Sequence, residues 1–381
     1  MESIKPKDFR SVKNFPGTTG NDLDVVLHRF AKIQDINSLL LAALLFLLAY
    51  LLNLGNITNA ALLFTFFILD WIMLWSLPRA GLSYGPPKPP LVILALGRII
   101  LNFIPAPWNW VAQMVGAMLV IYGFWVEPHF IRFGVQKLSS PKIKSSRPIR
   151  ILHLADLHVE RITYREKQLN RMVEQLKPDL ILFSGDILNL SYLKDDLAWR
   201  SAREIMEKWK APYGTYLVTG SPAVDLEENF PKIIEGLPIT WLNDQTAEVD
   251  IEGTRLQIIG LTCTHKPFED APRLEKIISP QNGSFSILLH HSPDLAPDAA
   301  LHQIDLHLAG HTHGGQVRLP WYGAIVTGSL YGKQFEAGRY HLDQTTLYVS
   351  RGIGLEGAGA PRVRFLCPPE ITLWELSGSD Q

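Results

Sequence analysis

Four short apolar runs in this chain lead, directly or after one glycine, into an acidic or imidazole side chain. The runs and the polar residues that follow them are 149–155 with Asp156, 180–184 with Asp186, 285–289 with His290 and His291, and 306–309 with His311. Each run has the length and the apolar content that are typical of a buried β-strand. We therefore expect a sheet that gathers these polar side chains in one place.

The spacing of the polar residues indicates a site for two metal ions. Residues two apart in an extended segment point to the same side, so Asp156 with His158, and His311 with His313, can each present two donors to one point. Carboxylate and imidazole ligands together suit Mn, Fe or Zn. Asp186 provides an acid between the two half-sites, as a bridged pair of metals requires. The pattern predicts a two-metal hydrolase site.

The order of these motifs resembles the calcineurin-like metallophosphoesterases, and the resemblance extends from residue 148 to residue 381. Segments 310–316 (GHTHGGQ) and 365–370 (FLCPPE) also resemble the membrane-associated branch of that family, whose substrates include lipid-linked pyrophosphates. The resemblance implies an α/β domain of two packed β-sheets flanked by helices, with two divalent metal ions (Mn, Fe or Zn). The implied ligands are Asp156, His158, Asp186 and His313 for the first ion, and Asp186, His291 and His311 for the second.

One motif departs from the family pattern. A Gly-Asn-His element is expected after the third strand, but the chain has Gly220, Ser221 and Pro222 there. A Ser hydroxyl is a weak neutral ligand, and Pro offers neither a proton nor a backbone donor. The candidates for the missing ligand are Ser221 itself and Asp225, and His265 is the candidate for the missing catalytic imidazole.

The loss of Asn and His leaves two functions open. Removing one general acid costs ~10²–10⁴-fold in rate, whereas activation by two metals persists, so we expect a metal-dependent phosphohydrolase of reduced activity. Its substrate would carry a phosphomonoester, phosphodiester or pyrophosphate bond. The alternative is a degenerate, non-catalytic membrane sensor that binds a phosphorylated ligand.

The first third of the chain is strongly apolar and predicts a transmembrane domain of about four helices. The apolar segments are 38–54, 60–77, 91–104 and 111–126. The first, second and fourth approach or reach the ~20 residues that a bilayer span requires. The third is shorter and is interrupted by Arg98, so it is either a span or an arm of a re-entrant hairpin.

The distribution of basic residues predicts the orientation of these helices. The N-terminal segment, loop 78–90 and segment 132–150 carry Lys and Arg, whereas loops 53–58 and 105–109 carry no charge. Four spans place every basic segment on one side, which is the positive-inside pattern. We therefore expect an integral membrane protein with its catalytic domain in the cytoplasm.

Asp70 and Arg98 lie within apolar segments, where a charge costs ~2.5–3.5 kcal/mol on insertion scales. An ion pair between the second and third segments is the simplest interpretation. The alternatives are a lipid headgroup site and side chains that extend to the interface.

We expect four regions along the chain. They are residues 1–36, an N-terminal segment with an amphipathic helix from Asn21 to Asp35 capped by Asn21; 37–127, the transmembrane domain; 128–147, a basic linker; and 148–381, the metallophosphoesterase domain. Within the last region the patterns predict helices at 164–176 and 197–210 and strands at 215–219, 247–251, 256–261, 345–350 and 370–376, with a hairpin turn at Gly253.

The composition limits the classes of partner that this chain is expected to bind. The net charge of -1 argues against nucleic acid as a partner, and the two cysteines are too few for a disulfide framework. The expected partners are the phospholipid bilayer and a phosphate-containing, amphiphilic substrate, and the sequence implies no protein partner.

Overall fold

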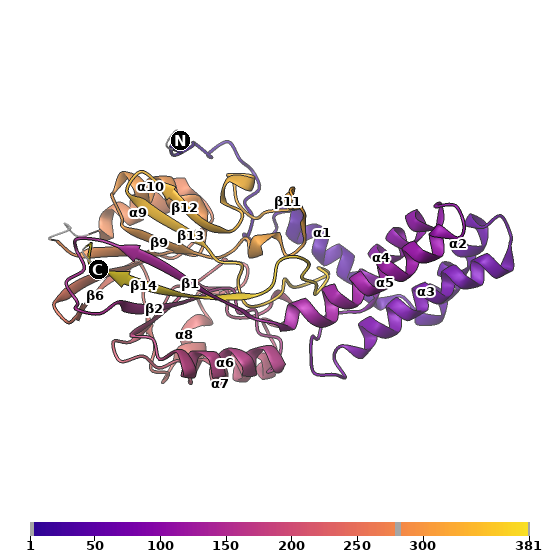
Figure 1. The fold of residues 1–381 in the computed structure, drawn as a ribbon, viewed down its shortest axis with the longest axis horizontal. Helices are drawn as coiled ribbons and strands as arrows, with labels where there is room; N and C mark the ends of the chain where they lie inside the picture. Colours follow the sequence, from indigo (N-terminus) through magenta and orange to yellow (C-terminus); the bar gives the residue numbers. More distant parts are fainter. Residues whose placement is uncertain (1–3, 279–282, 380–381) are drawn as a thin grey trace.

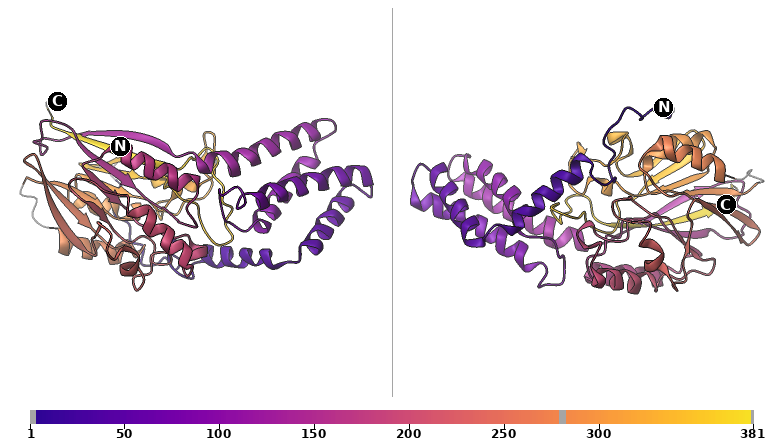
Figure 2. Two further views of the ribbon diagram at one scale, coloured as in Figure 1. Left: turned by 90° about the horizontal axis from the view of Figure 1, so that it is seen from below. Right: turned by 180° about the vertical axis from the view of Figure 1, so that it is seen from behind.

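The computed structural model of the chain describes residues 4–278 and 283–379. A helical bundle projects from one end of an α/β domain (Figures 1 and 2). The end of the bundle that meets this domain is called the near end below, and the opposite end is called the far end.

The bundle is built from the four predicted apolar segments, each of which forms a helix. These are α2 (Ser38–Leu52), α3 (Ile57–Ser76), α4 (Lys88–Asn102) and α5 (Trp108–Ile121), which continues through one π-helical and one 3-10 turn to His129. α3 and the continuous helix Trp108–His129 are long and apolar enough to cross a membrane. α2 qualifies only together with α1 (Asp22–Ala31) and its 3-10 extension, from which it is bent by 101°.

The predicted ion pair between Asp70 and Arg98 forms inside the bundle. Arg98 donates from Nε to Asp70 Oδ2 at 2.9 Å and from Nη2 to Oδ1 at 2.8 Å. Both side chains are only 3% exposed, so neither extends to the surface of the bundle. Gln113 on α5 donates from Nε2 to the Arg98 carbonyl at 2.8 Å, and its own oxygens face Arg98 Nη1. The pair thus joins α3, α4 and α5.

The α/β domain contains two six-stranded sheets, which confirms the predicted architecture. The first has the order β1 (Arg132–Ser139), β14 (Glu370–Ser377), β2 (Ile149–Leu154), β3 (Leu180–Phe183), β4 (Thr215–Leu217), β5 (Thr240–Trp241). The second has the order β12 (Gly338–Leu342), β13 (Thr345–Val349), β9 (Leu306–Ala309), β8 (Phe285–Leu289), β7 (Thr254–Gly260), β6 (Gln245–Ile251). The predicted turn at Gly253 joins β6 to β7 with a φ of +80°.

The sheets pack face to face, and helices cover their outer faces (Figure 1). Ile151 and Leu182 of the first sheet share one buried cluster with Ile258, Ile287 and Leu308 of the second. Helices α6 (Tyr164–Leu176), α7 (Asp196–Met206) and α8 (Phe230–Ile234) contribute to the core on the far side of the first sheet. Helices α9 (Pro267–Ile277) and α10 (Ala296–Leu301) pack on the second sheet. The core strands β2, β3, β8 and β9 coincide with the predicted runs to within one residue.

The predicted linker 128–147 is corrected by the structure. Its residues Arg132–Ser139 form strand β1, which pairs in parallel with β14 along the edge of the first sheet. An edge strand buries little of either face, and Phe133 and Val135 remain 40% and 44% exposed. The basic and polar side chains of this strand can therefore stay in water, which is why its composition suggested a linker.

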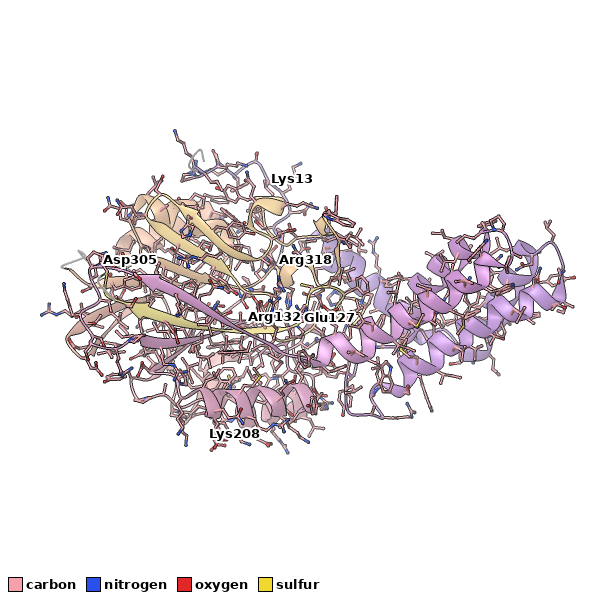
Figure 3. The ribbon with its side chains drawn as sticks, in the orientation of Figure 1. Lys13, Glu127, Arg132, Lys208, Asp305 and Arg318 are labelled. Carbon is pink, nitrogen blue, oxygen red and sulfur yellow. The ribbon has the colours of Figure 1, made fainter. Side chains whose placement is uncertain are left out.

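The segment 364–367 attaches the bundle to the domain. Glu127, labelled at the junction in Figure 3, accepts hydrogen bonds from the backbone amides of Leu366, at 2.8 Å, and Cys367. The Arg364 amide donates to the Gly123 carbonyl at 3.0 Å. The motif at 365–370 therefore links the end of α5 to the sheet.

The N-terminal segment folds back on the α/β domain. Phe9 stacks edge-on against Tyr331 and Phe15 against Phe268, with ring centroids 5.3 and 5.9 Å apart. Asn21 caps α1 as predicted, because its side chain accepts from the Asp24 amide at 3.0 Å.

Candidate two-metal site

The loops at the ends of β2, β3 and β9 hold most of the predicted ligands in an uncommon backbone conformation. The φ angles of Asp156, His158, Asp186, His311 and His313 are +49°, +43°, +63°, +71° and +51°. Non-glycine residues rarely adopt this left-handed region, and such conformations concentrate at functional sites. Each loop turns sharply here and directs its side chain toward the others.

The first ligand cluster contains Asp156, His158 and His313, whose candidate ligand atoms lie within 4.8 Å of one another. The Nε2 atoms of the two imidazoles are 3.0 Å apart, and His158 Nε2 is 3.5 Å from Asp186 Oδ2. His158 Nδ1 lies 3.2 Å from the Leu188 carbonyl, so its Nε2 is left to face the cluster. All four side chains are buried.

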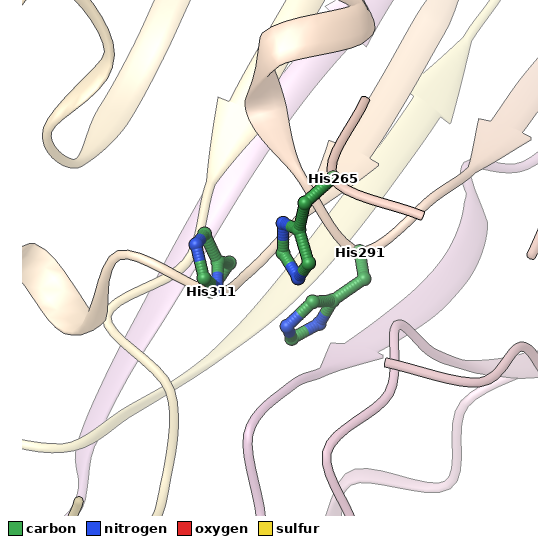
Figure 4. Close-up of side chains that lie close together, drawn as sticks. All are labelled: His265, His291 and His311. Atoms are coloured by element: carbon green, nitrogen blue, oxygen red, sulfur yellow. The ribbon is translucent and has the colours of Figure 1, made fainter. Parts of the chain in front are cut away.

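The second cluster is centred on His291. Asp156, Asp186 and His291 form one compact group, and His265, His291 and His311 form another (Figure 4). His291 Nε2 is 3.2 Å from Asp186 Oδ2, while its Nδ1 is 2.8 Å from the Ser184 carbonyl. His311 Nε2 is similarly engaged by the Gly328 carbonyl at 3.1 Å. Carbonyl partners of this kind orient the imidazoles of metal sites.

The neighbouring His290 points away from this cluster and belongs to a separate group with Cys263 and Asp270, whereas His291 lies in the cluster. His290 Nε2 lies 3.2 Å from Asp270 Oδ2, and its Nδ1 lies 2.9 Å from the Ser292 carbonyl. Asp270 itself also accepts from Thr264 and Arg273. This arrangement braces the loop that carries His265.

Ser221 lies inside the site, at the position where the family pattern has Asn. Its amide donates to Asp186 Oδ1 at 2.6 Å. Its hydroxyl oxygen is 3.2 Å from both Asp186 Oδ2 and His291 Nε2, and 3.1 Å from His265 Nε2.

Asp225 does not join the ligand groups formed by the described residues, which corrects the expectation that it replaces the missing Asn. Its carboxylate accepts three backbone N–H groups, from Asp186 and Gly220 at 2.8 Å each and from Ile187 at 3.0 Å. These bonds hold the left-handed turn at Asp186 against the Gly220 loop. The sequence does not show that the Asp225 carboxylate will accept backbone N–H groups, because these groups are brought together only by the fold.

The buried charges of the site affect one another's ionisation. Burial alone would raise the pKa of Asp186, but the nearby His291 and His158 hold it well below its ordinary value. Burial opposes the charged form of His291, yet Asp186 raises its pKa to about 9. Burial raises the pKa of Asp156 to about 6 and lowers that of His311 to about 3. An anionic Asp186 beside a neutral His311 is the combination that divalent cations bind.

Two buried polar atoms of the site lack a hydrogen-bond partner among the described residues. They are Asp156 Oδ2 and His265 Nδ1. A buried polar atom without a partner is costly, and coordination of a cation is one way to satisfy it. Together with the carboxylate and imidazole donors, these atoms fit a site for divalent metal ions.

A cavity of about 470 Å³ opens directly above both clusters. Asp186, Ser221, His311 and His313 form its polar floor. Its walls come from the N-terminal segment and α1, from the segment 315–317 and 326–328, and from 360–363 near the bundle. The apolar wall residues are Leu23, Leu27, Leu190, Val224, Val317, Val326 and Val363.

Comparison with known proteins identifies the domain. Residues 149–315 match the family model of calcineurin-like phosphoesterases. The chain is 29% identical over 266 residues to the uncharacterized metallophosphoesterase YkuE of Bacillus subtilis, covering 68% of this chain and 90% of YkuE. It is 27% identical over 269 residues to the phosphodiesterase YaeI of Escherichia coli, covering 67% and 92%. Its identity to the UDP-2,3-diacylglucosamine pyrophosphatase LpxG of Chlamydia trachomatis is 23% over 306 residues, covering 65% and 90%.

The fold, the motif order and these matches define a metal-dependent phosphoesterase domain. Residues 149–315 are therefore similar to the calcineurin-like phosphoesterases, and the family model and these relatives support the resemblance seen in the motifs of this domain.

Proposed function

We propose that this protein is a membrane-anchored, metal-dependent phosphoesterase that hydrolyses a phosphodiester or pyrophosphate bond in an amphiphilic, lipid-linked substrate. The observation that carries this proposal is the pairing of two ligand clusters, which share Asp156 and both approach Asp186 Oδ2, with an apolar-walled cavity above them. The polar floor suits a phosphate group, and the walls suit an attached apolar chain.

In this proposal Asp156, His158, Asp186 and His313 hold one ion, and Asp186, His291 and His311 hold the other. Two bound cations would supply Lewis-acid polarisation of the phosphoryl oxygens and activation of water. The protein's own contribution is orientation: carbonyl groups of Leu188, Ser184 and Gly328 fix three of the imidazoles. Pro222 supplies no proton to a leaving group, so we expect slower turnover than an intact Asn-His motif would allow.

Membrane anchorage would come from the bundle. α3 and the helix Trp108–His129 meet the length and hydropathy of a span. The uncharged loops lie at the far end, where Asn102 Nδ2 is 3.4 Å from Asn53 Oδ1. At the near end, Lys88 Nζ donates to the Gln34 carbonyl at 2.9 Å. Because the basic segments also lie near the phosphoesterase domain, the positive-inside pattern favours a cytoplasmic domain with all four helices in the membrane. α4, with 15 residues, is shorter than a full span and is not long enough to cross on its own.

An exposed hairpin next to the cavity supports a substrate drawn from the membrane. Strands β10 (Arg318–Leu319) and β11 (Gly323–Ala324) frame Trp321 and Tyr322, which are fully and 59% exposed. Val326, beyond β11, is 59% exposed and lines the cavity. Trp and Tyr favour the membrane interface, where an amphiphile presents its headgroup. The diacylated substrate in the name of the relative LpxG is consistent with this class.

The second candidate function is a non-catalytic sensor of a phosphorylated ligand, which Pro222 favours because it removes the family's catalytic imidazole. Both functions can be tested with the full chain purified in detergent. Hydrolysis of a generic phosphodiester and of a lipid pyrophosphate would be measured with added Mn²⁺, beside an Asp186→Asn variant. Metal-dependent turnover that is lost in the variant supports the enzyme, and equal rates in both proteins support the sensor.

A further inference from the structure

We propose that His265 is a ligand of the second metal ion, in the place that the family's Asn leaves empty at Ser221. This inference rests on the two-metal centre of the proposed function and names the residue that completes it. It assigns to His265 a role in holding the metal rather than that of a proton donor to the leaving group.

The position of His265 carries the assignment. Its imidazole belongs to the compact group with His291 and His311, whose candidate ligand atoms lie within 4.8 Å of one another (Figure 4). Its ring centroid is 4.1 Å from that of His311 and 5.7 Å from that of His291. Its Nε2 is 3.1 Å from the Ser221 hydroxyl, which in turn contacts Asp186. His265 therefore faces the atoms that would hold the second ion.

The backbone of His265 shares the signature of the predicted ligands. Its φ is +60°, within the range of +43° to +71° found at Asp156, His158, Asp186, His311 and His313. A non-glycine residue adopts this conformation at a cost, so the surroundings must hold it there.

The surroundings of His265 provide that support. The Thr264 hydroxyl donates to the buried Asp270 at 2.6 Å, and Arg273 donates to the Thr262 carbonyl at 2.7 Å. On the other side, Gly17 lies so close that a Cβ there would be 2.2 Å from His265 Nε2. The imidazole is thus fixed between a braced loop and the N-terminal segment.

The small side chain at position 221 fits the same assignment. The Ser221 hydroxyl already contacts His265 Nε2 at 3.1 Å, so a longer Asn side chain would enter the space that this imidazole occupies. Asn at 221 and His at 265 therefore compete for one position. Either residue can supply a neutral donor to the ion, and this chain has the imidazole.

The test measures metal binding rather than turnover. The full chain in detergent is stripped with a chelator and titrated with Mn²⁺, and bound metal per chain and the two dissociation constants are measured. We expect the wild type to bind two ions. In His265→Ala, the affinity for one of them should fall by more than the ~10–100-fold that is lost when an outer-shell partner of a metal ligand is removed. In Ser221→Asn/His265→Ala, the Asn is expected to restore most of that affinity.

Controls separate the ways in which this test can fail. His307 is buried on β9 outside both clusters, so His307→Ala is the matched variant and should bind both ions normally. His265→Gln, with circular dichroism, shows whether a loss reflects misfolding. If His265→Ala bound both ions as tightly as the wild type, the assignment would be overturned, even if turnover fell. A wild type that binds no metal, or binds it no better than Asp186→Asn, would instead overturn the proposed function.

Discussion

Removal of Arg98 alone is expected to destabilise the helical bundle more than removal of Arg98 and Asp70 together. Arg98→Met leaves the Asp70 carboxylate, 3% exposed, without a counter-charge. Breaking a buried ion pair from one side costs ~3–5 kcal/mol, because the remaining charge stays desolvated. The side-chain oxygen of Gln113 also loses its Arg98 donor, which adds roughly 1 kcal/mol.

The double variant Asp70→Leu/Arg98→Met removes both charges. Only the Gln113 term and imperfect packing remain, so a loss of about 1–2 kcal/mol is expected. Each single variant should therefore cost more than the double, and the pair should show a coupling free energy of several kcal/mol.

The assay is unfolding of the full chain in mild detergent by titration with a denaturing detergent, followed by circular dichroism and Trp fluorescence. Arg79→Met is the matched control, because Arg79 is exposed and its guanidinium lies over the Trp75 ring. It should cost about 1 kcal/mol or less. Single variants as stable as the wild type, or losses that simply add in the double variant, would refute a desolvated pair.

Four further predictions concern the α/β domain. Gly17 has a φ of +78°, and a Cβ there would collide with His265, so Gly17→Val should displace this imidazole. The affinity for one Mn²⁺ ion should then fall by roughly tenfold or more in a binding titration. Mn²⁺ at about 100 times its Kd should stabilise the wild type to thermal unfolding by ~2.7 kcal/mol, but not Asp186→Asn. Trp321→Ser should raise KM for a vesicle-borne amphiphile and leave kcat/KM for a water-soluble phosphodiester unchanged in steady-state kinetics. Burial raises the pKa of Asp298 to about 6, above its unfolded value, so its folded carboxylate is destabilising above pH 6 and this cost fades toward pH 4. Asp298→Asn should therefore stabilise the domain at pH 8 by about 1 kcal/mol, after allowance for solvent screening, with no gain near pH 4 in urea unfolding.

The sequence by itself determined the elements whose signals are local. Helix α6 has the predicted bounds, Tyr164–Leu176, because a polar helical pattern follows a Thr163–Glu166 capping box. The core strands follow from short apolar runs that are buried on both faces. The ligand types and their order along the chain follow from the motifs, since a residue placed after a strand is carried to the edge of the sheet.

Only the tertiary structure decided which groups meet across the chain. His265 approaches Ser221 from 44 residues away, and Asp225 bonds amides that become available only when the Asp186 turn has formed. Strand β1 pairs with β14, which lies at the opposite end of the domain's sequence. Because β1 is an edge strand with mostly exposed side chains, its polar composition did not indicate a strand. Such contacts depend on which loops and edges approach one another once the core has packed, and no local propensity encodes that choice.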